Sequence, residues 1–238
     1  MIKPVGAGFM PACFGFAILW GLAIHPQVFC SAVKYERRLR MAAATFPDPT
    51  QDSPLSPARD VQTAVLAGGC FWCVEAVYRQ LDGIISVTSG YSGGTADTAS
   101  YPIVCSGKTD HAEAVRLEFD ASKLTFGQLL KVFFSVAHDP TQLNRQGNDI
   151  GRQYRSTIFY TDENQRRIAE AYIRQLNEAH AYRSPIVTTL EPMKAFYEAE
   201  PYHQDYAARN PNQPYIACIA MPKVEKVREY YPEKLKAR

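Results

Sequence analysis

The sequence has little of several features that would assign it to a specialised class of protein. Basic residues exceed acidic ones by only 2 among 238 residues, which is too weak a positive field for a nucleic-acid-binding surface. Six cysteines are too few to hold together a disulfide-built miniprotein of this length. Apart from one N-terminal stretch, no apolar run is long enough to cross a bilayer, so a multi-span membrane protein is excluded.

Histidine is also scarce, and the chain lacks the glycine-rich phosphate fingerprint of a dinucleotide-binding fold. The five histidines are His25, His111, His138, His180 and His203. None of them stands at zinc-ligand spacing from the Cys70 and Cys73 pair. The sequence therefore predicts no metal ion and no organic cofactor.

The remaining composition suits one folded domain, since 46% of the residues are hydrophobic and 21% are charged. Strands and helices are expected to alternate. Period-two and short apolar runs predict strands over 63–67, 84–91, 112–119, 156–160, 186–190 and 216–221. Helical spacing predicts helices over 71–81, 125–137 and 162–180, with a helical tail. We expect a single α+β domain over 61–238, with helices packed on a sheet.

Two N-terminal segments precede this domain. Residues 1–40 contain an apolar stretch that is typical of a signal peptide or membrane anchor, but the basic cluster 34–40 behind it opposes export. Alternatively, Met41 is the true start and the segment is misassigned, or the segment is a local apolar arm. The protein would be cytoplasmic with a start at Met41, and membrane-anchored or exported otherwise. Residues 41–60 contain four prolines and predict a flexible linker.

Cys70 is the first candidate for chemistry, because it follows Gly68-Gly69 and opens a predicted helix. The free N–H groups and the positive dipole end of a helix lower the pKa of a thiol placed there. Cys70 is therefore either a nucleophile or a small buried hydrophobe. Together with Cys73 it also fits a general thiol–disulfide redox pair, and a non-catalytic binding module is a third possibility.

A run of motifs extends this reading. Gly69-Cys70-Phe71-Trp72-Cys73 resembles the active-site motif of the peptide methionine sulfoxide reductases of the A type. Further matches follow in order at 90–94, 101–107, 111–115, 138–141, 145–149, 153–156, 199–206 and 212–215. Many ordered matches over roughly residues 64 to 235 are far more specific than one five-residue motif.

The resemblance implies a ferredoxin-like central mixed sheet flanked by helices, and it assigns roles to matching residues. Cys70 would be the nucleophile and Glu113 the acid that protonates the departing oxygen. The tyrosines Tyr101 and Tyr154 would hold that oxygen, and Asp149 would organise the site. Phe71 and Trp72 would contact the substrate methyl group.

The family's activity is reduction of methionine S-sulfoxide, free or in proteins, as a repair of oxidative damage. A buried carboxyl keeps its proton near neutral pH, as the acid must. Attack leaves Cys70 as a sulfenic acid, and a second thiol converts it to a disulfide that thioredoxin reduces. Thioredoxin, oxidised proteins and free methionine sulfoxide are the partners implied, nucleic acid is not, and a monomer is expected.

The resolving cysteine is open at this stage. Many relatives carry a cysteine directly after the Asn-Gln-Pro-Tyr motif, where this chain has Ile216. Cys73 ranks first because a Cys-x-x-Cys disulfide is sterically reasonable, and Cys218 ranks second. Direct reduction by an outside thiol ranks third. Asp110, where the family usually has glycine, is a further departure; its carboxylate could alter the pKa of the acid or could equally point to solvent.

Overall fold

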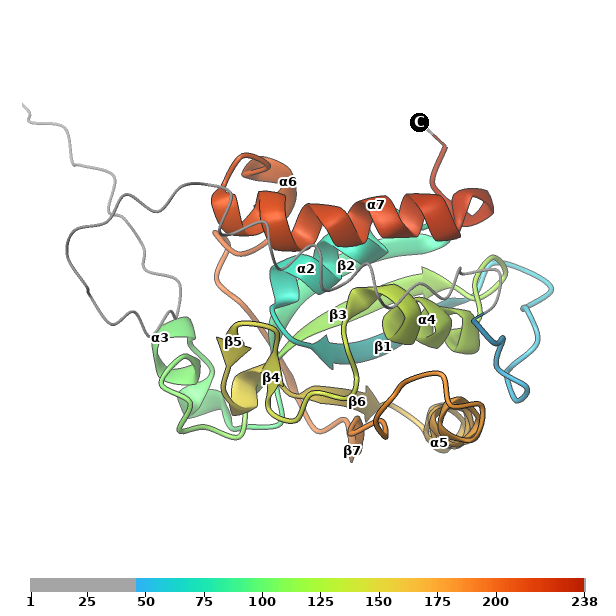
Figure 1. The fold of residues 1–238 in the computed structure, drawn as a ribbon, viewed down its shortest axis with the longest axis horizontal. Coiled ribbons are helices and arrows are strands. Elements are labelled where there is room, and N and C mark those ends of the chain that lie inside the picture. Colours follow the sequence, from blue (N-terminus) through green and yellow to red (C-terminus); the bar gives the residue numbers. More distant parts are fainter. Residues whose placement is uncertain (1–45, 238) are drawn as a thin grey trace, which may run out of the picture.

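The computed structural model describes residues 46–237 (Figure 1). The apolar N-terminal segment 1–40 lies outside this range, so its signal, anchor and misassigned-start interpretations stay predictions, as does the compartment. Between residues 46 and 237, no helix combines the length and the apolar character that a membrane crossing needs.

Six strands form one mixed sheet in the order β7-β6-β1-β3-β2-β8. They are β1 (Val61–Gly68), β2 (Ile84–Ser92), β3 (Ala112–Asp120), β6 (Ser156–Tyr160), β7 (Thr189–Pro192) and β8 (Phe196–Glu198). All neighbours are antiparallel except β6 and β7, which are parallel. A separate two-stranded ribbon joins β4 (Arg145–Gln146) and β5 (Asp149–Ile150).

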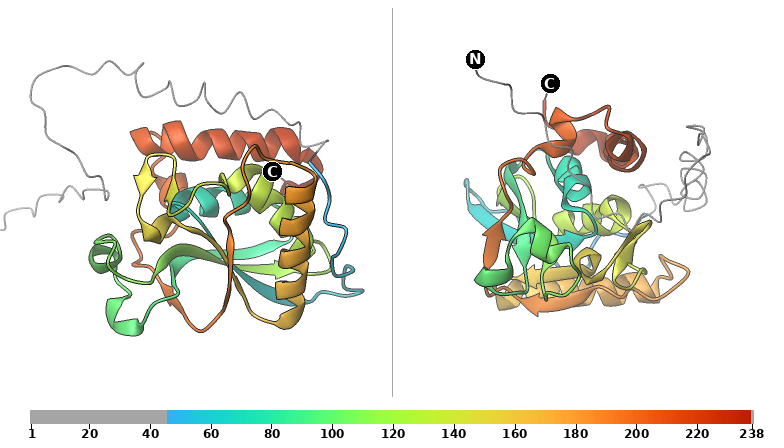
Figure 2. Two further views of the ribbon diagram at one scale, coloured as in Figure 1. Left: turned by 60° about the horizontal axis from the view of Figure 1, so that its bottom comes forward. Right: turned by 90° about the vertical axis from the view of Figure 1, so that its left-hand side faces the viewer.

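The helices are α2 (Phe71–Tyr78), α3 (Tyr101–Val104), α4 (Phe126–Val132), α5 (Glu163–Glu178), α6 (Tyr206–Arg209) and α7 (Met221–Tyr230). Three short 3₁₀ turns are η3 (Ala96–Thr98), η5 (Arg152–Tyr154) and η7 (Pro232–Lys234). Two π-helical turns, η4 (Phe133–Ala137) and η6 (Ile216–Ala220), follow α4 and precede α7. Figure 2 shows α7 and α2 on the same side of the sheet, with α7 outermost.

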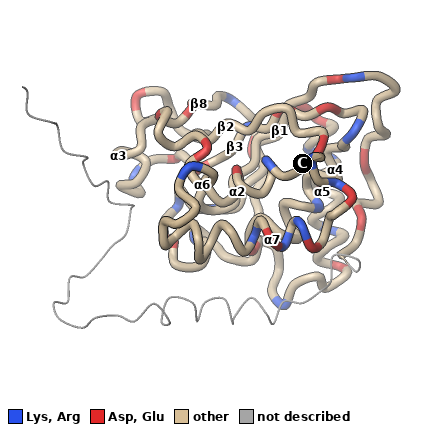
Figure 3. Tube along the Cα trace, turned by 90° about the horizontal axis from the view of Figure 1, so that it is seen from above, with Lys and Arg blue, Asp and Glu red and all other residues tan. Residues whose placement is uncertain are grey.

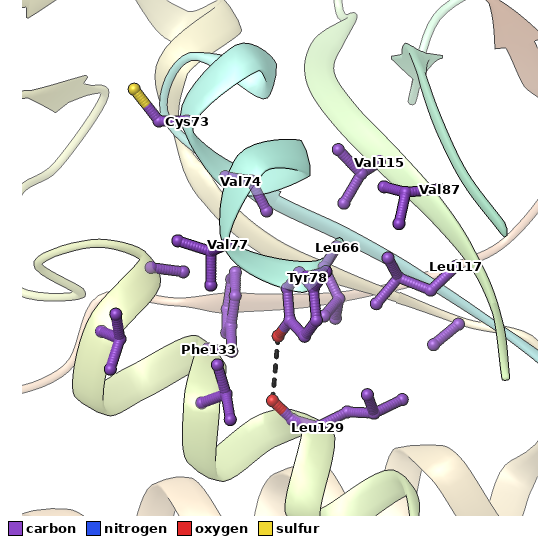
Figure 4. Close-up of a cluster of buried hydrophobic side chains, with 14 of the residues drawn as sticks. Leu66, Cys73, Val74, Val77, Tyr78, Val87, Val115, Leu117, Leu129 and Phe133 are labelled. Atoms are coloured by element: carbon purple, nitrogen blue, oxygen red, sulfur yellow. Dashed lines mark hydrogen bonds between the residues drawn. The ribbon is translucent and has the colours of Figure 1, made fainter. Parts of the chain in front are cut away.

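The helices bury one face of the sheet because alternate residues of the central strands are apolar. Leu66 of β1 and Val115 of β3 are cross-strand partners on this face, and both are fully buried. Tyr78 of α2 packs with them and donates its hydroxyl proton to the Leu129 carbonyl at 2.9 Å (Figure 4). The buried Tyr78 hydroxyl thus has a hydrogen-bond partner, as a polar group in a core requires.

A smaller cluster covers the opposite face, where Val65, Ala67 and Phe159 pack against Met193 and Phe196. Only residues 193–195 connect β7 to β8, although these are the two outermost strands. A connection this short spans about 13 Å, whereas the outer strands of a flat six-stranded sheet lie about 24 Å apart. The sheet is therefore curled.

The α+β class, the single domain and the mixed sheet with packed helices are confirmed. One predicted element is wrong: 216–221 is not a strand but the π turn η6 running into α7. A short buried apolar run has the same pattern in a strand and in a helix, so periodicity could not separate them. The strand predicted over 186–190 lies at 189–192 instead.

Part of the segment predicted as a linker makes defined contacts with the domain. Phe46 is buried and packs edge-on against Tyr182. Asp52 accepts hydrogen bonds from the Thr125 hydroxyl and, at 2.9 Å, from the Gly127 N–H. Gly127 lies in the first turn of α4, so the Asp52 carboxylate satisfies a helix N-terminus from 75 residues away.

Replacing Asp52 with alanine should lower the free energy of unfolding by about 1–2 kcal/mol, because α4 loses a charge-assisted cap. Urea unfolding monitored by circular dichroism measures the loss. Asp48→Ala is the matched control, since the Asp48 side chain is 81% exposed in its pair with Lys131 and should cost less than about 0.5 kcal/mol. Equal losses in the two variants would contradict the capping role of Asp52.

Candidate active site

The turn between β1 and α2 places Cys70 at the start of the helix. Gly69 has φ +87°, and a Cβ there would meet the Gln146 side chain at 2.6 Å, so only glycine fits. Cys70 is the N-cap residue of α2 and is 8% exposed. The glycine pair therefore brings the thiol to the helix end while the β4–β5 ribbon packs over the turn.

Glu113 approaches this helix end from β3. It lies on the helix-covered face, two residues before Val115, and is 2% exposed. Its Oε2 accepts a hydrogen bond of 3.1 Å from the Phe71 N–H, one of the free donors of the first turn of α2. Burial raises the pKa of Glu113 to about 8, and the nearby Asp149 and Cys73 add to the rise, while the Phe71 hydrogen bond opposes it. The carboxyl is thus mostly protonated at neutral pH.

The two thiols lie together and titrate differently. Burial, followed by the hydrogen bond and charge of Cys73 and by the charges of Glu113 and Asp149, raises the pKa of Cys70. The lowering expected from the helix end is therefore wrong for the substrate-free site, because desolvation outweighs the dipole. The hydrogen bond from Cys70 lowers the pKa of Cys73.

The structure brings the other predicted polar residues to the same place. Tyr101 and Tyr154 are buried, and the charges of Glu113, Cys70 and Asp149 add to the burial that raises the pKa of Tyr154. Asp149 accepts a hydrogen bond of 2.6 Å from the Tyr215 hydroxyl, and burial raises its pKa.

An aromatic cluster borders the thiols; its members are Phe71, Trp72, His203, Tyr206 and Tyr215. Trp72 stacks on Tyr206 with ring centroids 3.9 Å apart and planes inclined by 12°. The Trp72 indole N–H donates to His203 Nδ1 at 3.2 Å, and Tyr215 meets the same indole edge-on at 6.2 Å. Burial lowers the pKa of His203 to about 4, so its ring is uncharged at neutral pH and packs with the aromatic rings of the cluster.

Asp110 does not act on the acid in the way its position suggested. It forms an ion pair of 2.9 Å with Arg152, and both side chains are more than half exposed. Its charge is therefore neutralised and screened by solvent.

Among the described residues, the free cysteines are Cys70, Cys73 and Cys218. Cys73 lies three residues after Cys70 on the same helix, and each thiol shifts the pKa of the other. Cys218 lies half-buried on η6 and has no such effect on Cys70 among the described residues. Sequence reasoning gave no role to Tyr215 and did not single out Tyr206 or Lys223. Tyr206 and Tyr215 lie within the motifs 199–206 and 212–215 that carry the resemblance. Nothing in the sequence indicated a functional role for Lys223.

This arrangement can supply a proton and a sulfur nucleophile to one point in an apolar setting. Glu113 holds the proton, Cys70 presents the sulfur, and Cys73 is a second thiol within reach. Between residues 46 and 237, no three or more His, Cys, Asp or Glu side chains lie together so that they could hold a metal ion.

A family model described as peptide methionine sulfoxide reductase matches residues 62–235. The chain belongs to this family. It is 50% identical over 195 residues to peptide methionine sulfoxide reductase MsrA 2 of Synechocystis sp., covering 81% of this chain and 91% of that protein. It is 53% identical over 176 residues to the MsrA of Natronomonas pharaonis, covering 74% and 98%.

Solved structures agree with this assignment. Reduced Mxr1 from Saccharomyces cerevisiae has a TM-score of 0.58 and 32% identity, covering 69% of this chain and 92% of that one. Methionine sulfoxide reductase A of Corynebacterium diphtheriae has a TM-score of 0.55 and 31% identity, covering 69% and 88%. This reductase is therefore an oxidoreductase that reduces methionine sulfoxide, and the interpretation as a general thiol–disulfide oxidoreductase is not favoured.

Glu113→Gln should stabilise the folded reductase. A carboxyl whose folded-state pKa of about 8 exceeds its unfolded value stabilises the fold only at low pH, and this contribution is lost as the pH rises towards 8. The glutamine variant should therefore gain on the order of 2–3 kcal/mol over the wild type at pH 8.5 and much less at pH 4.5. Urea unfolding at both pH values measures this, with the exposed Glu178→Gln as control. A gain that does not depend on pH would contradict the assigned protonation.

Proposed function

We propose that Cys70 is the nucleophile and Glu113 the acid in the reduction of methionine S-sulfoxide. The observation that carries this proposal is the protonated Glu113 carboxyl, which is buried and bonded to the helix turn that begins at Cys70. A sulfoxide oxygen cannot leave as oxide, so an acid that keeps its proton at neutral pH is the group the reaction needs.

In the first half-reaction the Cys70 sulfur attacks the sulfoxide sulfur while Glu113 protonates the sulfoxide oxygen. Glu113 thereby becomes a carboxylate, and it takes up the proton that the Cys70 thiol loses. The attack forms a bond between Cys70 Sγ and the substrate sulfur. Transfer of the protonated oxygen to Cys70 Sγ then breaks this bond and the S–O bond of the substrate, so methionine is released in its reduced form and Cys70 is oxidised by two electrons to a sulfenic acid. Tyr101 and Tyr154 hydrogen-bond the oxygen, and Asp149 holds the Tyr215 side of the site.

Phe71 and Trp72 contact the substrate methyl group. The Trp72 indole is fixed on both sides, by its stack on Tyr206 and by its hydrogen bond to His203. A fixed apolar contact for the methyl group and a fixed acid for the oxygen leave one chirality at sulfur, which selects the S epimer. Free and protein-bound methionine sulfoxide carry the same reacting group, so both are substrates.

In the second half-reaction Cys73 resolves the sulfenic acid. Its place one helical turn after Cys70, where each thiol shifts the pKa of the other, supports this assignment over Cys218. Its thiol replaces the hydroxyl on Cys70, releasing water and leaving a Cys70–Cys73 disulfide. A thioredoxin-type dithiol then returns both cysteines to the reduced form, with no metal or organic cofactor.

Turnover of the separated S and R sulfoxides with dithiothreitol tests the assignment. The wild type should consume only the S epimer, and Cys70→Ser should be inactive. Cys73→Ser should keep activity with dithiothreitol, which can reduce a sulfenic acid directly, and lose most of it with thioredoxin. Consumption of neither epimer by the wild type would overturn the proposal.

The pH dependence of the first half-reaction tests Glu113 separately. The protonated fraction of a carboxyl with a pKa of about 8 falls tenfold per pH unit above that value, so kcat/KM should decline above pH 8. Glu113→Gln should lower the rate about 10²–10⁴-fold and remove this decline. A wild-type profile that rises steadily to pH 10 would exclude Glu113 as the acid.

Three further features belong to the same proposal: the type of core, the bounds of the domain and the oligomeric state. The antiparallel order β6-β1-β3-β2, with α2 between β1 and β2 and α4 between β3 and β6, supports a ferredoxin-like core. We take the reductase domain to span 61–238, with residues 46–60 packed against it through Phe46 and Asp52. Acidic and basic residues are interspersed along the chain (Figure 3), which fits a monomer that binds neither nucleic acid nor a strongly charged partner.

A further inference from the structure

Lys223 is buried without a counter-ion, which the reduction step leaves unexplained. The residue is 7% exposed, and its Nζ donates one hydrogen bond, of 2.8 Å, to the Ala137 carbonyl. In the described part of the chain, no carboxylate forms an ion pair with it. Buried ammonium groups are costly unless an anion or several acceptors compensate them, so an anion is expected nearby at some stage of the cycle.

The position of Lys223 restricts which anion this is. It lies in the first turn of α7, the helix that runs beside α2 in Figure 1. Its positive charge acts on three titratable side chains: Cys73, Asp149 and His138. Burial lowers the pKa of His138 to about 3, so that ring is neutral. Asp149 already accepts a hydrogen bond from the Tyr215 hydroxyl.

We infer that Lys223 is the counter-cation of the Cys73 thiolate, and thus a positioning residue for formation and opening of the Cys70–Cys73 disulfide. This inference rests on the proposed role of Cys73 as the resolving cysteine. It assigns Lys223 to the second half-reaction and not to the attack on the sulfoxide.

The first half-reaction removes the influence of the Cys70 thiol, which also favours the thiolate form of Cys73. In the reduced site, the Cys70 hydrogen bond is the largest influence that lowers the pKa of Cys73; the charge of Lys223 and the Tyr215 hydroxyl follow. Once Cys70 is a sulfenic acid, its thiol proton is gone. The Tyr215 hydroxyl lies 3.7 Å from Cys73 Sγ, but it donates its hydrogen to Asp149 at 2.6 Å. The charge of Lys223 is the influence that persists.

The other groups facing Cys73 do not replace this charge. Asp149 opposes a thiolate, and burial opposes it as well. Glu113 of β3 is protonated near neutral pH, so it contributes no positive charge. Figure 4 shows the Cys73 sulfur pointing away from Leu66 and Tyr78.

The step balances with the groups named. The Cys73 thiolate attacks Sγ of the Cys70 sulfenic acid, an S–S bond forms and the S–O bond breaks. The hydroxide leaves as water with the proton of the Glu113 carboxyl, which the proton released by the Cys73 thiol replaces. When a dithiol reductant attacks Cys70 Sγ, the electron pair of the S–S bond returns to Cys73 as a thiolate. A leaving thiolate of lower pKa departs faster, so Lys223 would assist both directions.

Single-turnover experiments on the full chain test the inference. Enzyme and methionine S-sulfoxide are mixed without reductant, and methionine, dimedone-trapped sulfenic acid and the Cys70–Cys73 disulfide are each followed by mass spectrometry. In Lys223→Met, methionine should form at the wild-type rate, while disulfide formation at pH 7 slows about tenfold and sulfenic acid accumulates. Raising the pH to 9 should restore most of the disulfide rate.

Two further variants separate charge from packing. Lys223→Arg keeps the charge and should retain a disulfide rate close to that of the wild type. Lys226 lies on the same helix, and its ammonium group faces the Tyr230 ring at 5.4 Å. Lys226→Met should therefore leave both half-reactions unchanged. In a Cys70→Ser background, the pH dependence of Cys73 alkylation by iodoacetamide should shift upward by about one unit on Lys223→Met.

The outcomes separate the two proposals. Equal loss of both half-reactions in Lys223→Met, an unchanged disulfide rate, or an unchanged alkylation profile overturns the role of Lys223. Formation of methionine by the wild type without a Cys70–Cys73 disulfide removes Cys73 as the resolving cysteine, and the inference falls with it. Absence of methionine from the wild-type reaction overturns the catalytic assignment itself.

Discussion

The hydrogen bond from the Phe71 N–H to Glu113 Oε2 is the contact on which the rest of the site depends. It joins the first turn of α2 to β3 and so sets the acid beside the thiol that opens the helix. A helix N-terminus favours a carboxylate, yet burial and the nearby Asp149 and Cys73 outweigh that preference and keep the proton on Glu113. One interaction thus fixes both the geometry and the protonation state that sulfoxide reduction requires.

The second requirement is an apolar setting around the reacting sulfur, and distant parts of the chain supply it. Trp72 lies beside the nucleophile, but its ring is held by His203 and Tyr206, which follow more than 130 residues later. The same segment is tied back to α2, because the buried Glu75 accepts the Asp205 N–H at 3.0 Å. The C-terminal part of the domain therefore completes the site.

Burial raises the pKa of both thiols, but the neighbouring groups shift the two in opposite directions. Desolvation keeps Cys70 protonated in the empty site, so the nucleophile becomes reactive only as its proton finds an acceptor there. Cys73 lies one helical turn further along α2, where the Cys70 hydrogen bond and Lys223 favour its thiolate. Tyr215, which contacts this second thiol, directly precedes η6, and Lys223 lies on α7. π-Helical turns such as η6 are frequent at functional sites.

The sequence by itself determined the family, the α+β class, most strands and helices, and the identity of Cys70 and Glu113 as candidates. These follow from local patterns: alternation on β3, helical spacing after Cys70, and motifs of a few adjacent residues. The tertiary structure alone decided that 216–221 is helical, that burial raises the pKa of Cys70, that Asp110 is paired with Arg152, and that Lys223 is buried and lowers the pKa of Cys73. The physical reason is that burial and charge at a site are sums over neighbours from many segments, and sequence spacing does not contain those distances.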